Sequence, residues 1–213
     1  MAGLADDWPE NRQTCVDVLC AYLRLPYDPD PDEDSDPAER AAYRANREVR
    51  HTVIRVITAH LKDDAPVSWQ GLNFDFTGVI FDGGDFTGAE FSGGEVSFGG
   101  AVFSGGQVSF DGAEFSGGAV GFGARFSGGE VSFGSARFSG SEVGFGARFS
   151  GGTVRFAYAR FSGGEVSFGS AVFSGGEVDF TNPGDWSVPP AFPWTDTPPT
   201  GVKLPKKEDQ SQV

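Results

Sequence analysis

The sequence predicts a mainly β protein: a right-handed, quadrilateral β-helix solenoid preceded by an α-helical N-terminal segment. Phe occurs 21 times and Gly 32 times against a single Met, so one residue type fills the core repeatedly. Between residues 74 and 180 the phenylalanines recur at spacings of five, then of seven alternating with five or four. From Ala89 onward a small apolar residue, alternately Ala and Val, stands two positions before each Phe, which is the inward-facing alternation of a short strand.

The repeat length decides the size of one coil. The literal repeat is twelve residues, as in FSGGEVSFGGAV, and a coil of that length encloses too little space for two Phe rings. We therefore expect two repeats per coil, giving four faces filled by four Phe, two Val and two Ala. Phe98 and Phe122 should then stack in adjacent coils, and a separation of one coil rise between Phe98 and Phe110 would exclude this arrangement. The Gly that follows the Phe is expected to permit the turn at each corner.

The repeats divide the chain into three parts. Residues 1–65 are expected to form the helical segment, residues 66–182 the β-helix, and residues 183–213 a Pro-rich cap with a disordered tail. Aromatic residues among the prolines of this tail are expected to cover the last coil, because an open sheet edge has to be protected.

Two helices are predicted in the N-terminal segment. The first spans about residues 8–24, with Asp7 as N-cap and Pro9 in its first turn, and the second spans about residues 37–62. Asp36-Pro37-Ala38-Glu39 is typical of a capping box at the start of the second helix. Each helix has one apolar face, and we expect both to cover the open end of the β-helix, since solenoids need capped ends. An acidic linker, residues 26–36, joins them.

Composition limits the classes of function. The net charge of −14 argues against direct nucleic-acid binding, because phosphate contacts need clustered Lys and Arg. The first residues lack the features of a signal peptide, and no apolar run is long enough for a membrane span, so a cytoplasmic location is expected. Cys15 and Cys20 are predicted to point away from each other on a helix, as buried free thiols.

Catalytic chemistry finds few candidate residues. The only histidines, His51 and His60, lie nine residues apart on one predicted helix, and the repeats contain no His, Cys or Lys. Serine hydroxyls in the repeats should hydrogen-bond the backbone at turns, without a base to activate them. We therefore expect no enzyme activity, no cofactor and no metal.

The acidic linker offers one alternative, a calcium site. Its carboxylates match positions one, three, five and twelve of an EF-hand loop: Asp28, Asp30, Asp32 and Glu39. Glu33 stands where that loop needs a glycine, and two prolines stiffen the segment. A disordered acidic linker is therefore the favoured interpretation.

The runs DFTGVIFDGGDFTGAEF and FSGGEVSFGGAVF resemble bacterial pentapeptide-repeat proteins over residues 74–180. The chain departs from the common A-(D/N)-L-x-x pattern, since Phe replaces the central Leu and Gly-Glu pairs are inserted on alternate faces. The helical segment is similar to the region that precedes the repeats in actinobacterial relatives, many of which look membrane-anchored further upstream.

The resemblance implies a non-catalytic interaction or scaffold module with an unidentified protein partner, and leaves a homodimer open. The alternative that it implies is a DNA mimic that binds DNA gyrase or another topoisomerase. Residues 75–180 hold 12 acidic residues and 5 arginines, so the predicted rod is acidic, but recurring arginines weaken DNA mimicry. The candidate partner-binding residues are the arginines of the second helix and of the repeats: Arg40, Arg44, Arg47, Arg55, Arg125, Arg137, Arg148 and Arg160. The alternative for the arginines of the second helix, which form a stripe together with His51, is a solvent-exposed face without a binding role.

Overall fold

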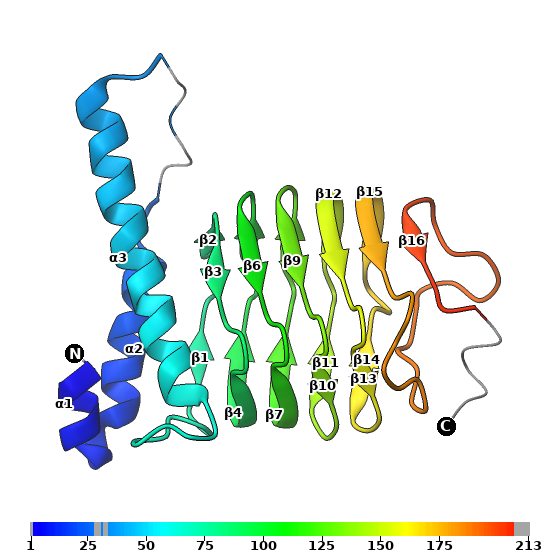
Figure 1. Ribbon diagram of the computed structural model, residues 1–213, viewed down its shortest axis with the longest axis horizontal. Coiled ribbons are helices and arrows are strands. Elements are labelled where there is room, and N and C mark those ends of the chain that lie inside the picture. The colour runs from blue at the N-terminus through cyan, green and yellow to red at the C-terminus, as the bar shows by residue number, and fades with distance from the viewer. Residues whose placement is uncertain (1, 28–30, 32–33, 207–213) are drawn as a thin grey trace.

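A β-solenoid dominates the structure, a computed structural model that describes residues 2–27, 31 and 34–206. The N-terminal helices lie across one end of the solenoid and the C-terminal segment lies across the other (Figure 1). The strands pair in parallel, as expected when each coil adds one strand to each face. Together they form two sheets.

The strands are short, because each face of the coil is only a few residues long. The first half of the solenoid contains β1 (Phe74–Asp75), β2 (Ile80–Phe81), β3 (Gly84–Asp85), β4 (Glu90–Ser97), β5 (Val102–Phe103), β6 (Gln107–Ser109), β7 (Glu114–Gly121) and β8 (Arg125–Phe126). The second half contains β9 (Glu130–Ser132), β10 (Arg137–Phe138), β11 (Glu142–Gly144), β12 (Arg148–Arg155), β13 (Arg160–Phe161), β14 (Glu165–Ser167), β15 (Val172–Asp179) and β16 (Val202–Lys203).

The phenylalanines form four columns along the solenoid, one for each face. Phe98 stacks on Phe122 with ring centroids 4.6 Å apart and planes 5° apart, which confirms two repeats per coil. Phe98 and Phe110 lie in the same coil and meet edge to face, at 5.8 Å and 83°. The first column continues in the same way, and it contains Phe76, Phe98, Phe122, Phe145, Phe168 and Phe192.

Small residues complete the core. Valines such as Val96 and Val120 stack in register and are buried, and so are alanines such as Ala101 and Ala113. The prediction for the glycines needs one correction, because the left-handed residue is not the one directly after Phe. In the longer corners it is the second Gly of Ser-Gly-Gly, as at Gly118 with φ +71°. A Cβ there would lie 2.1 Å from the carbonyl oxygen of Gly94 in the preceding coil.

The helical segment contains α1 (Ala2–Asp7), the 3₁₀ turn η1 (Pro9–Asn11), α2 (Arg12–Leu23) and α3 (Pro37–Leu61). The predicted first helix therefore starts later than expected and is preceded by a separate short helix. The cause is Pro9, which disfavours the α conformation of Trp8 before it, and Trp8 accordingly has φ −128° and ψ 74°. At α3 the side chain of Asp36 accepts a hydrogen bond of 2.7 Å from the Ala38 N–H, as the predicted N-cap requires.

The helices bury their apolar faces against the first coil. Val16 and Cys20 of α2 and Ile57 and Leu61 of α3 are completely buried in the same core cluster as the phenylalanines. Cys15 and Cys20 are buried free thiols, and burial raises the pKa of Cys20 to about 12. Burial therefore disfavours the reactive thiolate form of Cys20.

The C-terminal segment continues the columns in an irregular last coil. Trp186 packs on Phe161 at 5.2 Å, and Trp194 on Phe173 at 5.3 Å. Strand β16 pairs with β15, so the last long strand has a partner on its outer edge. The end of the predicted disordered tail, residues 207–213, lies outside the described residues.

Candidate interaction surfaces

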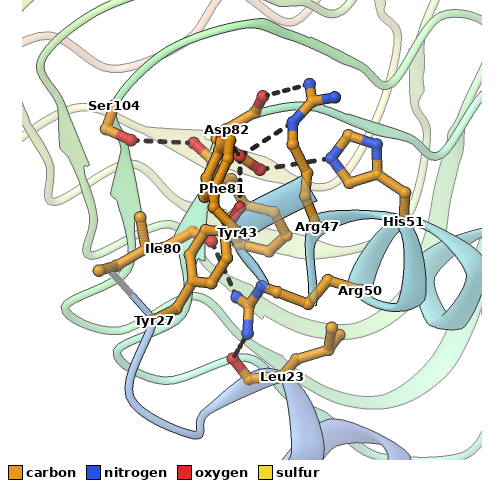
Figure 2. Close-up of polar contacts among 10 residues, drawn as sticks. All are labelled: Leu23, Tyr27, Tyr43, Arg47, Arg50, His51, Ile80, Phe81, Asp82 and Ser104. Carbon is orange, nitrogen blue, oxygen red and sulfur yellow. Dashed lines mark hydrogen bonds and ion pairs between the residues drawn. The ribbon is translucent and has the colours of Figure 1, made fainter. Parts of the chain in front are cut away.

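Asp82 joins the helical segment to the solenoid. It follows β2 in the first coil, and its carboxylate receives hydrogen bonds from the hydroxyls of Tyr27 and Tyr43, at 2.6 and 2.7 Å. Arg47 Nε donates to the same oxygen at 3.0 Å, and His51 Nε2 lies 3.3 Å from the other oxygen. Figure 2 shows these four side chains converging on Asp82 from the linker and from α3.

The position of Asp82 explains how the solenoid recognises the helix. Later coils carry Ser at the equivalent corner, where a hydroxyl such as that of Ser104 donates to the carbonyl of the preceding coil, 3.4 Å away. The first coil has no preceding coil, and the longer carboxylate reaches out to the helix. Gly83 allows close approach, because a Cβ there would lie 3.0 Å from the His51 ring.

The electrostatics of this junction favour a charged Asp82. Burial alone would raise the pKa of Asp82, but the hydrogen bonds from Tyr27 and Tyr43 and the charge of Arg47 outweigh it, so the pKa lies below its usual value. Burial and the hydrogen bond to Asp82 raise the pKa of Tyr27, which therefore stays a neutral donor. Asp82 is therefore a charged carboxylate surrounded by hydrogen-bond donors, and it holds the N-terminal helices against the first coil.

Arg50 is the second connection, and only 3% of its surface is exposed. Its guanidinium donates to the carbonyl oxygens of Leu23 at 2.8 Å and Ile80 at 2.9 Å and lies 4.2 Å from the centre of the Tyr27 ring. Burial lowers the pKa of Arg50, but two carbonyl acceptors and an aromatic face stabilise its charge. Arg50 thus connects the end of α2, the middle of α3 and strand β2 (Figure 2).

The predicted arginine stripe of α3 is divided between two roles. Arg47, together with His51, binds Asp82 and faces the solenoid. Arg55 stays at the surface, where it donates to Thr52 at 2.8 Å and lies 3.6 Å from Glu48. Arg44 is exposed and Arg40 is partly exposed, further toward the start of the helix.

The four predicted arginines of the repeats lie in two columns on different sheets. Arg125 pairs in register with Arg148, and Arg137 pairs in register with Arg160. They share a position in the literal repeat, but two repeats per coil place them on two faces. Glu114 precedes Arg137 in its column and lies 3.4 Å from it.

Sequence reasoning missed the Asp82 cluster, although one signal was present. Asp82 stands where the later coils carry Ser104, Ser127, Ser150 and Ser174, so the first coil departs from the repeat at that corner. The linker residues of the calcium hypothesis, Asp28, Asp30, Asp32 and Glu33, lie outside the described residues. Within the described ranges, no group of three or more His, Cys, Asp or Glu residues could hold a metal ion.

These features define the structural class of the protein. It is a four-sided β-solenoid that is closed by helices at one end and by an aromatic segment at the other. A family model described as pentapeptide repeats (9 copies) matches residues 76–123. Residues 76–123 therefore match pentapeptide repeats, and the structure continues the same stacked coils of a β-solenoid to Phe180. No curated protein and no solved structure matches the chain. None of the helices in the described ranges combines the length and the apolar character needed to cross a membrane.

Proposed function

We propose that the protein is a non-catalytic interaction module of the cytoplasm, in which the solenoid is a rigid support and the start of α3 binds a protein partner. The observation that carries this proposal is the position of α3. The N-terminal part of α3 extends beyond the edge of the solenoid (Figure 1). We call residues 37–46 of α3 its projecting half.

The projecting half has a free outer face. Ala41 and Ala45 are exposed and lie one turn apart on the same side of the helix, and exposed Arg44 borders this side, next to Arg47. Tyr43 and Arg47 face the other way and bind Asp82, so the helix is held in place while its outer face stays accessible. Small side chains flanked by arginine suit an acidic groove on a partner protein, in which the helix would lie.

The surroundings of the reactive residue types support a non-catalytic role. His60 is stacked on Trp69 with centroids 3.9 Å apart, and its ring nitrogens meet the Val56 carbonyl and Asp6. His51 is held against Asp82. Two buried cysteines kept as free thiols are typical of a reducing compartment, which favours the cytoplasm.

The alternative, a DNA mimic that binds a topoisomerase, needs a continuous acidic face. One outward column of the solenoid begins with Glu90 and Glu114 but continues with Arg137 and Arg160. A duplex presents negative charge at every step, and two cations in the middle of the column interrupt that pattern. This arrangement favours the interaction module over the mimic.

Affinity capture from host lysate at low and moderate salt tests the proposal. The variant Ala41→Glu/Arg44→Glu changes the projecting half, and Ala119→Glu/Arg160→Glu makes the same chemical changes on the solenoid. We expect a retained protein that the first variant loses and the control keeps. A topoisomerase that all three proteins retain and that salt releases would contradict the proposal and support the mimic.

A further inference from the structure

One face of the solenoid is cationic in an otherwise acidic protein. Arg125 and Arg148 stack in register on β8 and β12, with Val102 before them and Val172 after them in the same column. Both arginines are exposed, and 45% of the Val172 surface is exposed. We call the strip formed by Val102, Arg125, Arg148 and Val172 the arginine ladder.

The guanidinium groups of the ladder lack an anionic partner among the described residues. Neither the Arg125 side chain nor the Arg148 side chain forms an ion pair or a hydrogen bond there. Three other outward cations of the solenoid do have a partner: Arg137 lies 3.4 Å from Glu114, Lys203 lies 2.7 Å from Glu177, and Arg155 pairs with Glu130. Among the described residues, Arg160 shares the unpaired state of the ladder arginines. Like charges in register on neighbouring strands repel each other, so an external anion would relieve a repulsion that the free protein retains.

The ladder also borders a groove of about 340 Å³. Small residues of three successive coils line it beside the ladder, including Gly100, Gly123 and Gly146. Among the described residues that line it there is no Asp or Glu, although the chain contains 30 of them. The groove therefore offers room for a backbone next to two cations and two apolar side chains.

We propose that the arginine ladder binds an extended segment of a partner protein with the pattern apolar-x-acidic-x-apolar. Rings of the adjacent Phe column are separated by 4.7, 4.9 and 4.8 Å, so the ladder spans about 14 Å from Val102 to Val172. Five extended residues place their first, third and fifth side chains on one side over about 13–14 Å. The two apolar side chains then meet Val102 and Val172.

The central carboxylate of such a segment falls midway between the two arginines. Each guanidinium can donate to one of its oxygens in a charge-assisted hydrogen bond, so one Glu or Asp serves as the partner of both arginines and reduces the repulsion between them. This surface lies on the solenoid and does not depend on the projecting half of α3, so each proposal can fail without the other.

An NMR titration of the ¹⁵N-labelled full chain with the peptide acetyl-Gly-Val-Ser-Glu-Ser-Val-Gly-amide tests the ladder. We expect saturable shifts at the amides of residues 123–126 and 146–149, with a dissociation constant at or below about 1 mM, as befits one short contact. The variant Arg125→Gln/Arg148→Gln should weaken binding at least about tenfold, as should Gln in place of the peptide's Glu. The control Arg137→Gln/Arg155→Gln removes the same charge from arginines that have acidic partners, and should bind within about twofold of the parent.

Four results would overturn the proposal. The first is no saturable shift in the parent protein, and the second is equal loss in both double variants, which would indicate a net-charge effect. The third is inorganic phosphate binding as tightly as the peptide at the same residues, which would reduce the ladder to an anion site. Sedimentation velocity separates one further occupant: self-association that Arg125→Gln/Arg148→Gln abolishes, without peptide binding, would show a second copy of the chain on this face and contradict the proposed partner segment.

Discussion

Replacing Asp82 with Ser should release the helical cap while leaving the solenoid intact. Ser is the residue of the equivalent corner in later coils, so the backbone of the first coil accepts it. The substitution removes the acceptor of three hydrogen bonds and the partner of His51, and only 14% of the Asp82 side chain is exposed. Hydrogen bonds to a charged group contribute about 1.5–3 kcal/mol each, and the partial exposure of Arg47 reduces its share. We expect α3 to lose about 2–4 kcal/mol of its docking free energy.

Hydrogen exchange measured by mass spectrometry tests this prediction. Amides of α3 in Asp82→Ser should exchange roughly 30–1,000-fold faster, whereas residues 122–168 should keep their protection, because each coil interacts only with its neighbours. Asp82→Asn, which keeps the shape and removes the charge, should have an intermediate effect. Unchanged exchange in α3, or equal acceleration in every coil, would refute the assigned role of Asp82.

The pH dependence of the same variant follows from the lowered pKa of Asp82. A carboxylate whose folded pKa lies below its unfolded value, about 3.9, stabilises the protein above that value and loses this effect as the pH falls through the folded pKa. The difference between the parent protein and Asp82→Ser should therefore be present at neutral pH and shrink below about pH 4. A difference that grows in acid would contradict a charged Asp82.

Three further substitutions and one control test the packing of the solenoid by urea denaturation. Gly118→Ala should destabilise the protein by at least about 2 kcal/mol, because the added Cβ clashes with the Gly94 carbonyl and the backbone is left-handed. The control Gly144→Ala, where nothing lies within 4 Å of the added Cβ, should change the stability by less than about 1 kcal/mol. Tyr158→Gly should stabilise the protein by about 0.5–1 kcal/mol, because Tyr158 has φ +59° at a corner where Gly88 and Gly112 stand in earlier coils, and its ring is exposed. A destabilised variant would instead show that the ring contributes to the fold. Phe122→Ala should cost about 3–5 kcal/mol, because it opens a cavity between the stacked rings of Phe98 and Phe145, and a loss below about 1 kcal/mol would contradict the packed column.

The solenoid was predictable because each coil repeats the same local instruction. The spacing of phenylalanines and the alternation of Val and Ala required four faces, and the stacking of Phe98 on Phe122 confirms that requirement. The burial of Val16 and Ile57 on helix faces was predictable for the same reason, because periodicity alone marks an inward side.

The junction and the arginine columns were harder to predict, because they depend on how separate elements meet. Tyr27 lies in the linker and Tyr43 in α3, and nothing local in the sequence directs their hydroxyls to Asp82. Arg125 and Arg137 look equivalent in the twelve-residue repeat, yet they belong to different sheets. The late start of α2 follows from the effect of Pro9 on Trp8. The sequence-based prediction placed Pro9 in the first turn of the helix, and so it did not include the break that this proline causes.

The central claim, that the projecting half of α3 binds a partner, is tested most directly by site-specific photocrosslinking in the host. A benzoylphenylalanine residue would replace exposed Ala45 on the outer face of α3, or exposed Ala119 on the solenoid as the control. We predict a discrete protein adduct from position 45 that is absent from position 119. Adducts from position 119 alone, or none that depends on position 45, would contradict the claim.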